Sequence, residues 1–353
     1  MICIETQYFS LNRTLLLAFG LWPYQQSKFT RLQFILFFGI LTSSILFQVK
    51  DLMIELQNIY NNLEDECESA IVRKYNYNAK RYTTMLTVIA VCSMFIFTFI
   101  QFWSNIFDII LSRNVSQSHH VPIIMEYFID QNKYFYLIML HIHVAICIGI
   151  VSMVAIGTML IAYLQHTCGM FRISSYRIER AMKSNMLQNI ILKNENLILQ
   201  GIISAIDIHR LAMKLSKLLV SKFELMLFCL ITVGVISLSL NLFRVFQMDS
   251  SIDNIRELIF PVLFIFISIF YMFIANYIGQ DVMDHTNQVF VTVYNVQWYV
   301  VPLHIQRIVL FLLQRGTKDF TLRVGGLFIG SLECFATLVK ASVSYFTVMR
   351  SMR

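Results

Sequence analysis

The chain has 353 residues, of which 57% are hydrophobic and 14% are charged, and its formal net charge is +7. A soluble globular domain carries about 25% charged residues, so this composition predicts a membrane-embedded protein instead. No basic stretch is interleaved with aromatic residues, so nothing indicates nucleic-acid binding, and the positive charge suits cytoplasmic loops beside anionic lipid.

Six hydrophobic segments are candidates for membrane-spanning helices, since about 20 apolar residues cross the hydrocarbon core. We therefore expect an all-α, polytopic helical bundle that forms a single membrane domain over residues 1–353. The first segment is the shortest, close to the lower length limit. The predicted spans are 33–49, 83–103, 135–164, 223–246, 258–278 and 324–348.

The loops between these spans differ in basic residues, and Lys and Arg accumulate on the cytoplasmic side. Three basic loops are expected to be cytoplasmic, namely 50–82, 165–222 and 279–323. Two loops that are poor in Lys and Arg, together with the C-terminal tail, are expected to be extracellular, namely 104–134, 247–257 and 349–353.

The N-terminal segment does not fit this alternation. Residues 1–32 carry basic residues and are expected to be cytoplasmic, yet the loop that follows the first span is also basic. Either the first segment does not cross the membrane, or a span is missing between it and Lys50.

The cytoplasmic loops are predicted to be helical, because residues 165–222 are charged and poor in Gly and Pro. A second helix is predicted within Trp298–Gln314, as a surface or partner-packing helix rather than a span. Its apolar stripe has helical spacing and consists of Ile305, Ile308, Val309, Leu312 and Leu313.

Histidine and cysteine pairs are poorly placed to bind a metal. His141 and His143 are two residues apart, which turns them about 200° around a helix. The same spacing separates His166 from Cys168. We therefore expect no metal ligands and no cofactor.

Polar residues near the end of the fifth span, Asp281, Asp284 and His285, are interpreted as interfacial capping groups rather than catalytic ones. The sequence has no glycine-rich phosphate loop, GxSxG elbow or HExxH motif, so no enzymatic activity is indicated.

The last span differs from the others because it contains two ionisable residues, Glu333 and Lys340, and ends in the cluster SYFTV. Charged groups within a membrane segment face the interior of a bundle or a wet pathway. The span is a candidate pore-lining helix, and anchoring to neighbouring helices remains an equal alternative for the two charges.

Aromatic residues at one outer helix end, Phe95, Phe99 and Trp103, are compatible with lipid contact, core packing or an apolar ligand cavity. The sequon at Asn114 is a glycosylation candidate and would report an extracellular loop. A second sequon occurs at Asn12.

Several strings of residues occur in a characteristic order: LNRTLLLAFGLWP, QHTCGMFR, YIGQDVMDHTNQV, YNVQWYVVPLHIQRIVLFLLQR and SLECFATLVKASVSYFTVMRS. In these strings the chain resembles the insect odorant receptor family over nearly its whole length. The ending SYFTV differs from the tail of gustatory receptors. No DRY-like or NPxxY motif indicates a G-protein-coupled receptor.

The resemblance implies seven spans, a cytoplasmic N-terminus and an extracellular C-terminus. It also implies a ligand-gated cation channel, a heterotetramer with an odorant co-receptor subunit, in the plasma membrane of olfactory sensory neuron dendrites. The segment Trp298–Gln314 would lie in a cytoplasmic anchor region that holds the subunits together.

The resemblance further places functional residues. The pore and gate would be formed by the end of the last helix, at Tyr345, Val348, Ser351 and Met352. A pocket for a small apolar volatile would lie in the outer half of the membrane, with candidates Phe95, Phe99, Trp103, Met139 and His141.

The chain departs from the family near its start, where SSILFQ runs directly into VKDLMIELQNIYNNLEDE and the family's second span is expected to be absent. Three hypotheses therefore stay open: an odorant-gated channel subunit, a truncated isoform without ligand response, and a small-solute transporter. The transporter hypothesis predicts an internal repeat, which the sequence does not display.

Overall fold

The computed structural model describes residues 65–110, 134–187, 191–247, 255–318 and 320–352. The predicted first span at 33–49, the N-terminal segment 1–32 and the sequon at Asn114 lie outside these residues, so the expectations for them remain predictions. The chain divides into two units at Glu66, and the unit Cys67–Arg353 contains the helices described below.

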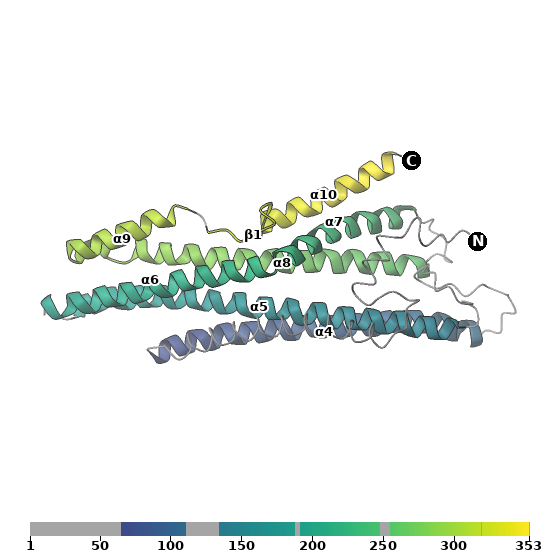
Figure 1. Cartoon of the computed structure of the whole chain (residues 1–353), viewed down its shortest axis with the longest axis horizontal. Coiled ribbons are helices and arrows are strands. Elements are labelled where there is room, and N and C mark those ends of the chain that lie inside the picture. The colour runs from purple at the N-terminus through teal and green to yellow at the C-terminus, as the bar shows by residue number, and fades with distance from the viewer. Residues whose placement is uncertain (1–64, 111–133, 188–190, 248–254, 319, 353) are drawn as a thin grey trace, which may run out of the picture. The chain divides into compact units, whose positions relative to one another are not determined.

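The described residues are almost entirely helical (Figure 1). The long helices and the short ones follow one another along the chain as α4 (Glu66–Ile110), α5 (Phe135–Leu187), α6 (Ile191–Lys222), α7 (Glu224–Gln247), α8 (Ile255–Asn295), the 3-10 helix η2 (Trp298–Val300), α9 (Leu303–Gly316) and α10 (Leu332–Ser351).

Within the described residues, five helices are long and apolar enough to cross a membrane: α4, α5, α7, α8 and α10. Each of them contains most or all of one predicted span. The helices α4, α5 and α8 are much longer than the predicted spans, because they continue into polar sequence that lacks Pro and is poor in Gly. Within the predicted helical loop, α5 and α6 confirm helix for residues 165–187 and 191–222.

Helix α8 is central to the packing. It contacts α5, α7, α9 and α10, while α6 packs along α5. The most completely buried side chains lie where α5, α6 and α8 meet, and they include Phe171, Ile202 and Val282. The core is therefore concentrated in α6 and in the parts of α5 and α8 that follow the predicted spans.

The predicted amphipathic helix at Trp298–Gln314 is confirmed, as η2 and α9. Helix α9 buries Ile305, Val309 and Leu312 and leaves its other face exposed. Pro302 is its N-cap residue and makes no side-chain capping hydrogen bond.

The last helix begins at Leu332, not at Val324 as predicted for the span. Residues before it form a two-stranded antiparallel sheet of β1 (Arg323–Val324) and β2 (Phe328–Ile329), with Arg323 opposite Ile329. Gly325 and Gly326 have positive φ angles of 61° and 69°, which end any continuous helix at this point.

Candidate functional site

The start of α10 is fixed to α8 by direct contact between backbones. A Cβ atom placed on Gly279 of α8 would lie 2.5 Å from the carbonyl oxygen of Gly330. Beside this contact, Ser331 N–H donates to Asn276 Oδ1 at 3.3 Å, and Ser331 Oγ caps α10 by accepting from Cys334 N–H at 3.1 Å. Only glycine permits so close an approach, so this joint sets where α10 begins.

The sheet before α10 is also held by the start of α7. The Gly325 N–H donates to Glu224 Oε1 at 3.0 Å. The ring of Phe228 lies 5.9 Å from that of Phe328, measured between centroids. A side chain on Gly325 would collide with Phe228. The connection into α10 is therefore fastened to both α7 and α8.

Helix α10 packs one face against α7 and α8. Leu338 forms a cluster with Leu238 of α7 and Met272 of α8. One turn on, Ser239 Oγ donates to the carbonyl oxygen of Ser342 at 3.0 Å, which brings α7 and α10 close together. These contacts give α10 a defined rotation about its axis, so the identity of its uncovered side is determined.

The uncovered side of α10 carries every predicted pore residue. Tyr345, Val348 and Met352 are 60%, 51% and 83% exposed, and Ser351 is exposed as well. Glu333 and Lys340 project from the same uncovered side. Their roles in conduction remain predictions, but the geometry leaves all of these side chains uncovered by the described part of their own chain.

The predicted pocket residues on α4 and α5 differ in exposure. Phe95 and Phe99 lie one turn apart on an exposed face of α4, and His141 is also exposed. Met139 of α5 is buried. The side chain of Trp103 lies outside the described residues. These five candidates remain predictions.

The opposite face of α4 forms a polar–aromatic cluster that the sequence reasoning missed. Phe97 stacks on His143 of α5 at 6.0 Å between centroids and contacts Phe260 of α8 edge-on at 5.7 Å. Thr98 Oγ1 lies 3.1 Å from His143 Nε2. Residues 97 and 143 follow the candidates Phe95 and His141 by two positions, and two positions turn a helix to its other side.

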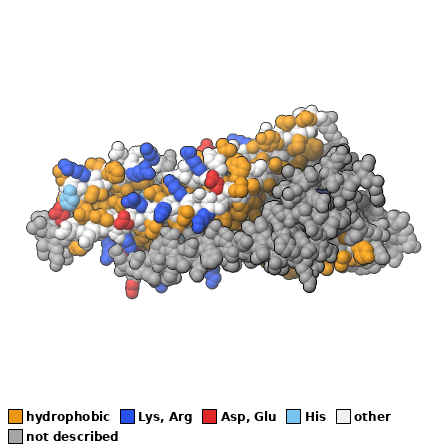
Figure 2. All heavy atoms as spheres, viewed as in Figure 1, with side chains coloured by type: hydrophobic (Ala, Val, Ile, Leu, Met, Phe, Trp, Pro, Cys, Tyr) orange, Lys and Arg blue, Asp and Glu red, His pale blue; other side chains and the backbone are white. Residues whose placement is uncertain are grey.

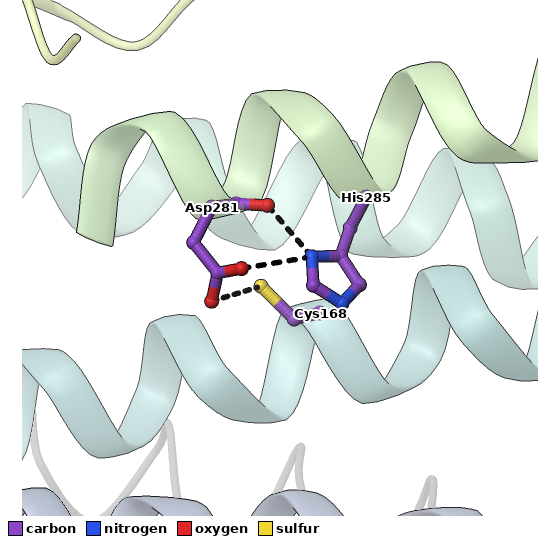
Figure 3. A group of neighbouring side chains, drawn as sticks. All are labelled: Cys168, Asp281 and His285. Carbon is purple, nitrogen blue, oxygen red and sulfur yellow. Dashed lines mark hydrogen bonds and ion pairs between the residues drawn. The ribbon is translucent and has the colours of Figure 1, made fainter. Parts of the chain in front are cut away.

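A second missed group lies between α5 and α8 and consists of Cys168, Asp281 and His285 (Figure 3). The Asp281 carboxylate contacts both of the other side chains: Oδ1 is 3.2 Å from His285 Nδ1, and Oδ2 accepts from Cys168 Sγ at 3.9 Å. Gln165 Nε2 also donates to Oδ2, at 2.6 Å. Tyr75 of α4 reaches His285 Nε2 at 2.7 Å.

The donor atoms of Cys168, Asp281 and His285 lie within 4.8 Å of one another, and sulfur, nitrogen and oxygen are zinc-type ligands. In this structure, however, His285 Nδ1 faces two acceptors, the Asp281 carboxylate and the Asp281 carbonyl oxygen at 2.7 Å, so it carries a proton in the neutral ring. A metal would have to displace that proton and the thiol proton. We interpret the group as a hydrogen-bond network that links α4, α5 and α8.

The interpretation of Asp281, Asp284 and His285 as capping groups is wrong. Helix α8 continues to Asn295, so the three residues lie in its middle and cannot cap an end. Cys168, which donates to Asp281, is 113 residues away in the sequence, so no local spacing could have identified the group.

Comparison with known proteins identifies a family. A family model described as 7tm Odorant receptor matches residues 32–343. The curated protein Odorant receptor 10 of Aedes albopictus is 26% identical over 99 residues, which make up 28% of this chain and 26% of that protein. The alignment thus spans about a quarter of the relative's length.

Two solved structures of the insect olfactory receptor OR5 from Machilis hrabei share the fold. The structure in complex with eugenol matches with a TM-score of 0.64 and 13% identity, over 86% of this chain and 75% of that one. The other matches with a TM-score of 0.64 and 12% identity, over 99% of both chains.

Proposed function

Since the chain belongs to the 7tm odorant receptor family, we propose that this multi-pass membrane protein is one subunit of an odorant-gated cation channel. In this proposal α10 of several subunits surrounds one pore, and a co-receptor subunit completes the assembly. A small apolar volatile binds in the outer half of the membrane and opens the pore. The protein acts in the plasma membrane of olfactory sensory neuron dendrites.

The uncovered side of α10 is the observation that supports this proposal most directly. A helix end fixed to α7 and α8 on one side presents Tyr345, Val348 and Met352 on the side left open. Glu333 and Lys340 lie on the open side too, where ionisable groups need water or other subunits rather than lipid.

In this proposal, α8 couples ligand binding to pore opening. Phe260 of α8 contacts Phe97 in the outer part, and Gly279 of the same helix contacts Gly330 at the start of α10. A ligand that shifts α8 against α4 would therefore also move the joint at which α10 begins.

The first test is co-expression of the chain with an odorant co-receptor and recording of odour-evoked current. Eugenol is a reasonable first probe, since a structural relative was solved with it, followed by other small apolar volatiles. We expect an inward cation current that the co-receptor alone does not give. Surface delivery without any such current would favour the non-responsive isoform, and substrate uptake without current would favour a transporter.

The pore assignment is tested by Val348→Ala, which should change cation permeability ratios or unitary conductance. The matched control is Val343→Ala, which removes the same atoms from α10 at another exposed position. Equal behaviour of the two variants would contradict the assignment of Val348 to the pore.

The proposed orientation is tested by glycosylation. Asn114 should carry a glycan and Asn12 should not, as shown by endoglycosidase shifts of variants that retain one sequon each. Modification at Asn12 would place the N-terminus outside the cell and favour the non-responsive isoform.

A further inference from the structure

A cavity of about 730 Å³ lies among α6, the start of α7, α8 and the segment from α9 to β1. Its size is in the range of small-molecule sites. The walls carry five basic side chains from three separate stretches of sequence: Lys214, Lys217, Arg315, Lys318 and Arg323. On the face drawn in Figure 2, Lys and Arg side chains gather on the described part of the surface.

These five cations are not neutralised within the described part of the chain. None of them forms an ion pair there, and all five are exposed. The one acid in the wall, Glu224, already accepts the Gly325 N–H. Asp319 lies outside the described residues, and counting it leaves five cations against two acids.

Other features of the wall suit a phosphorylated ligand. The Lys217 ammonium lies 5.2 Å above the centroid of the Phe320 ring, which holds this charge at the cavity by a cation–π contact. Ser221 and Thr321 add hydroxyl donors. A phosphate monoester carries about −1.5 to −2 charges at pH 7, so several converging cations match it better than one lipid phosphodiester.

The position of the cavity relates it to the membrane. Glu224 in its wall begins α7, and Arg323 precedes α10 by one short sheet, so two candidate spans start beside it. All five cations come from segments that the charge distribution assigns to the cytoplasm. An anionic group at the cytoplasmic lipid surface would therefore be within reach.

We propose that this cavity binds a polyphosphorylated headgroup, supplied by a phosphoinositide of the cytoplasmic leaflet. The same chemistry would accept a free inositol polyphosphate, and the experiment distinguishes the two sources. If the proposed channel function holds, an occupant bound to Arg323 would also stabilise the connection that sets the start of α10.

The test measures binding, so its result does not depend on channel activity. The full-length chain is reconstituted into phosphatidylcholine nanodiscs, and binding of fluorescent phosphatidylinositol 4,5-bisphosphate is titrated. The variant Lys214→Gln/Lys217→Gln should bind roughly 30-fold more weakly, because each basic side chain near an anionic lipid raises the affinity about 5-fold. The control Lys74→Gln/Lys80→Gln removes the same charge from exposed positions on α4 and should bind like the unaltered chain.

Competition on the unaltered chain supplies a second measurement that requires no substitution. Inositol 1,4,5-trisphosphate should displace the lipid probe, whereas phosphatidylserine at equal concentration should not. Displacement at concentrations similar to those of the lipid would identify a free polyphosphate as the ligand, and much weaker displacement would identify the lipid. Equal weakening in both double variants, or equal competition by phosphatidylserine, would overturn the proposal of a site.

Discussion

The inner region of the bundle, residues 158–182 of α5, 198–220 of α6 and 278–293 of α8, buries most of its apolar side chains within one chain. The outer region, residues 83–99 of α4 and 135–155 of α5, leaves many of them uncovered: Phe95 is 71% exposed, and Leu137 and Ile148 are also exposed. The inner region is therefore a folded core in its own right. The outer region leaves apolar side chains open to lipid, to other subunits, to a ligand or to parts of the chain outside the described residues.

The inner region is also held together by a buried ion pair. In the inner region Arg177 binds Glu68 with two parallel hydrogen bonds, Nε to Oε1 at 2.7 Å and a terminal nitrogen to Oε2 at 2.8 Å. Arg177 also contacts Ser204 of α6. The side chain of Glu68 is fully buried and that of Arg177 is 10% exposed, so this pair joins α4, α5 and α6 in the interior of the bundle. The differences between the regions can be tested by substitution.

The largest effect is expected for Arg177→Met. The substitution would leave the buried Glu68 without its cationic partner, and breaking such a pair lowers the free energy of unfolding by about 3–5 kcal/mol. The apparent melting temperature of the detergent-solubilised chain measures this. Arg172→Met removes an exposed arginine from the same helix and serves as the control. Similar melting temperatures for the two variants would show that the inner region does not depend on the ion pair.

The next largest effect is expected for Gly279→Ala, because the added methyl group would lie 2.5 Å from the Gly330 carbonyl oxygen. Overpacking of this kind costs up to about 3 kcal/mol. It should also displace the start of α10 and reduce odour-evoked current. Gly149→Ala, on α5, has no atom within 4 Å of the new methyl group and should leave melting and current unchanged. A normal current from Gly279→Ala would contradict the role of the joint.

An intermediate effect is expected from acid. Burial between Phe171 and Phe290 lowers the pKa of His209 from 6.5 to about 4. The folded chain then holds this ring neutral while the unfolded chain takes up a proton. Stability is therefore full above pH 6.5 and falls as the pH approaches 4, by about 2 kcal/mol at pH 5.

The variant His209→Leu should lose this part of the acid sensitivity while melting at or above the temperature of the unaltered chain at pH 8. The comparison at pH 8 is the internal control, because the ring is neutral in both states there. An unchanged pH profile of the melting temperature would show that His209 is not the group responsible.

The smallest effect is expected on the exposed face of the outer region. Phe95→Ala should change the free energy of unfolding by less than about 0.5 kcal/mol in detergent, whereas Phe97→Ala should lower it by about 1 kcal/mol because it removes two aromatic ring pairs. If Phe95 lines the odorant pocket, its substitution should still shift the concentration that gives half-maximal current. Equal destabilisation by both substitutions would remove the distinction between the two faces of α4.

The sequence predicted features that depend on local periodicity. The stripe at Ile305, Val309 and Leu312 is predictable because apolar residues at helical spacing need no knowledge of their partners. The helical character of residues 165–222 is predictable for a similar reason, since the segment has no Pro and only two Gly residues. Long apolar segments likewise identify the helices that contain the predicted spans.

The remainder depends on contacts between distant residues. Cys168 meets Asp281 only because α5 and α8 lie side by side at the same level, and the Gly279–Gly330 contact likewise joins distant segments. The two glycines at 325 and 326 are a local signal that residue 324 does not begin a helix. Hydrophobicity outweighed that signal in the prediction.

The length of α5 has a mechanical consequence. Its 53 residues form a rod about 80 Å long, of which the hydrocarbon core holds about 30 Å, so roughly 50 Å continue on one side. When such a rod pivots in the membrane, a small change of tilt displaces its far end in proportion to its length. A tilt of about 2° moves that end by roughly 2 Å. Since that end is embedded in a close-packed core, the displacement cannot be absorbed by loose side chains. The rod would act as a lever that turns a slight change of tilt among the outer helices into motion of the whole inner region.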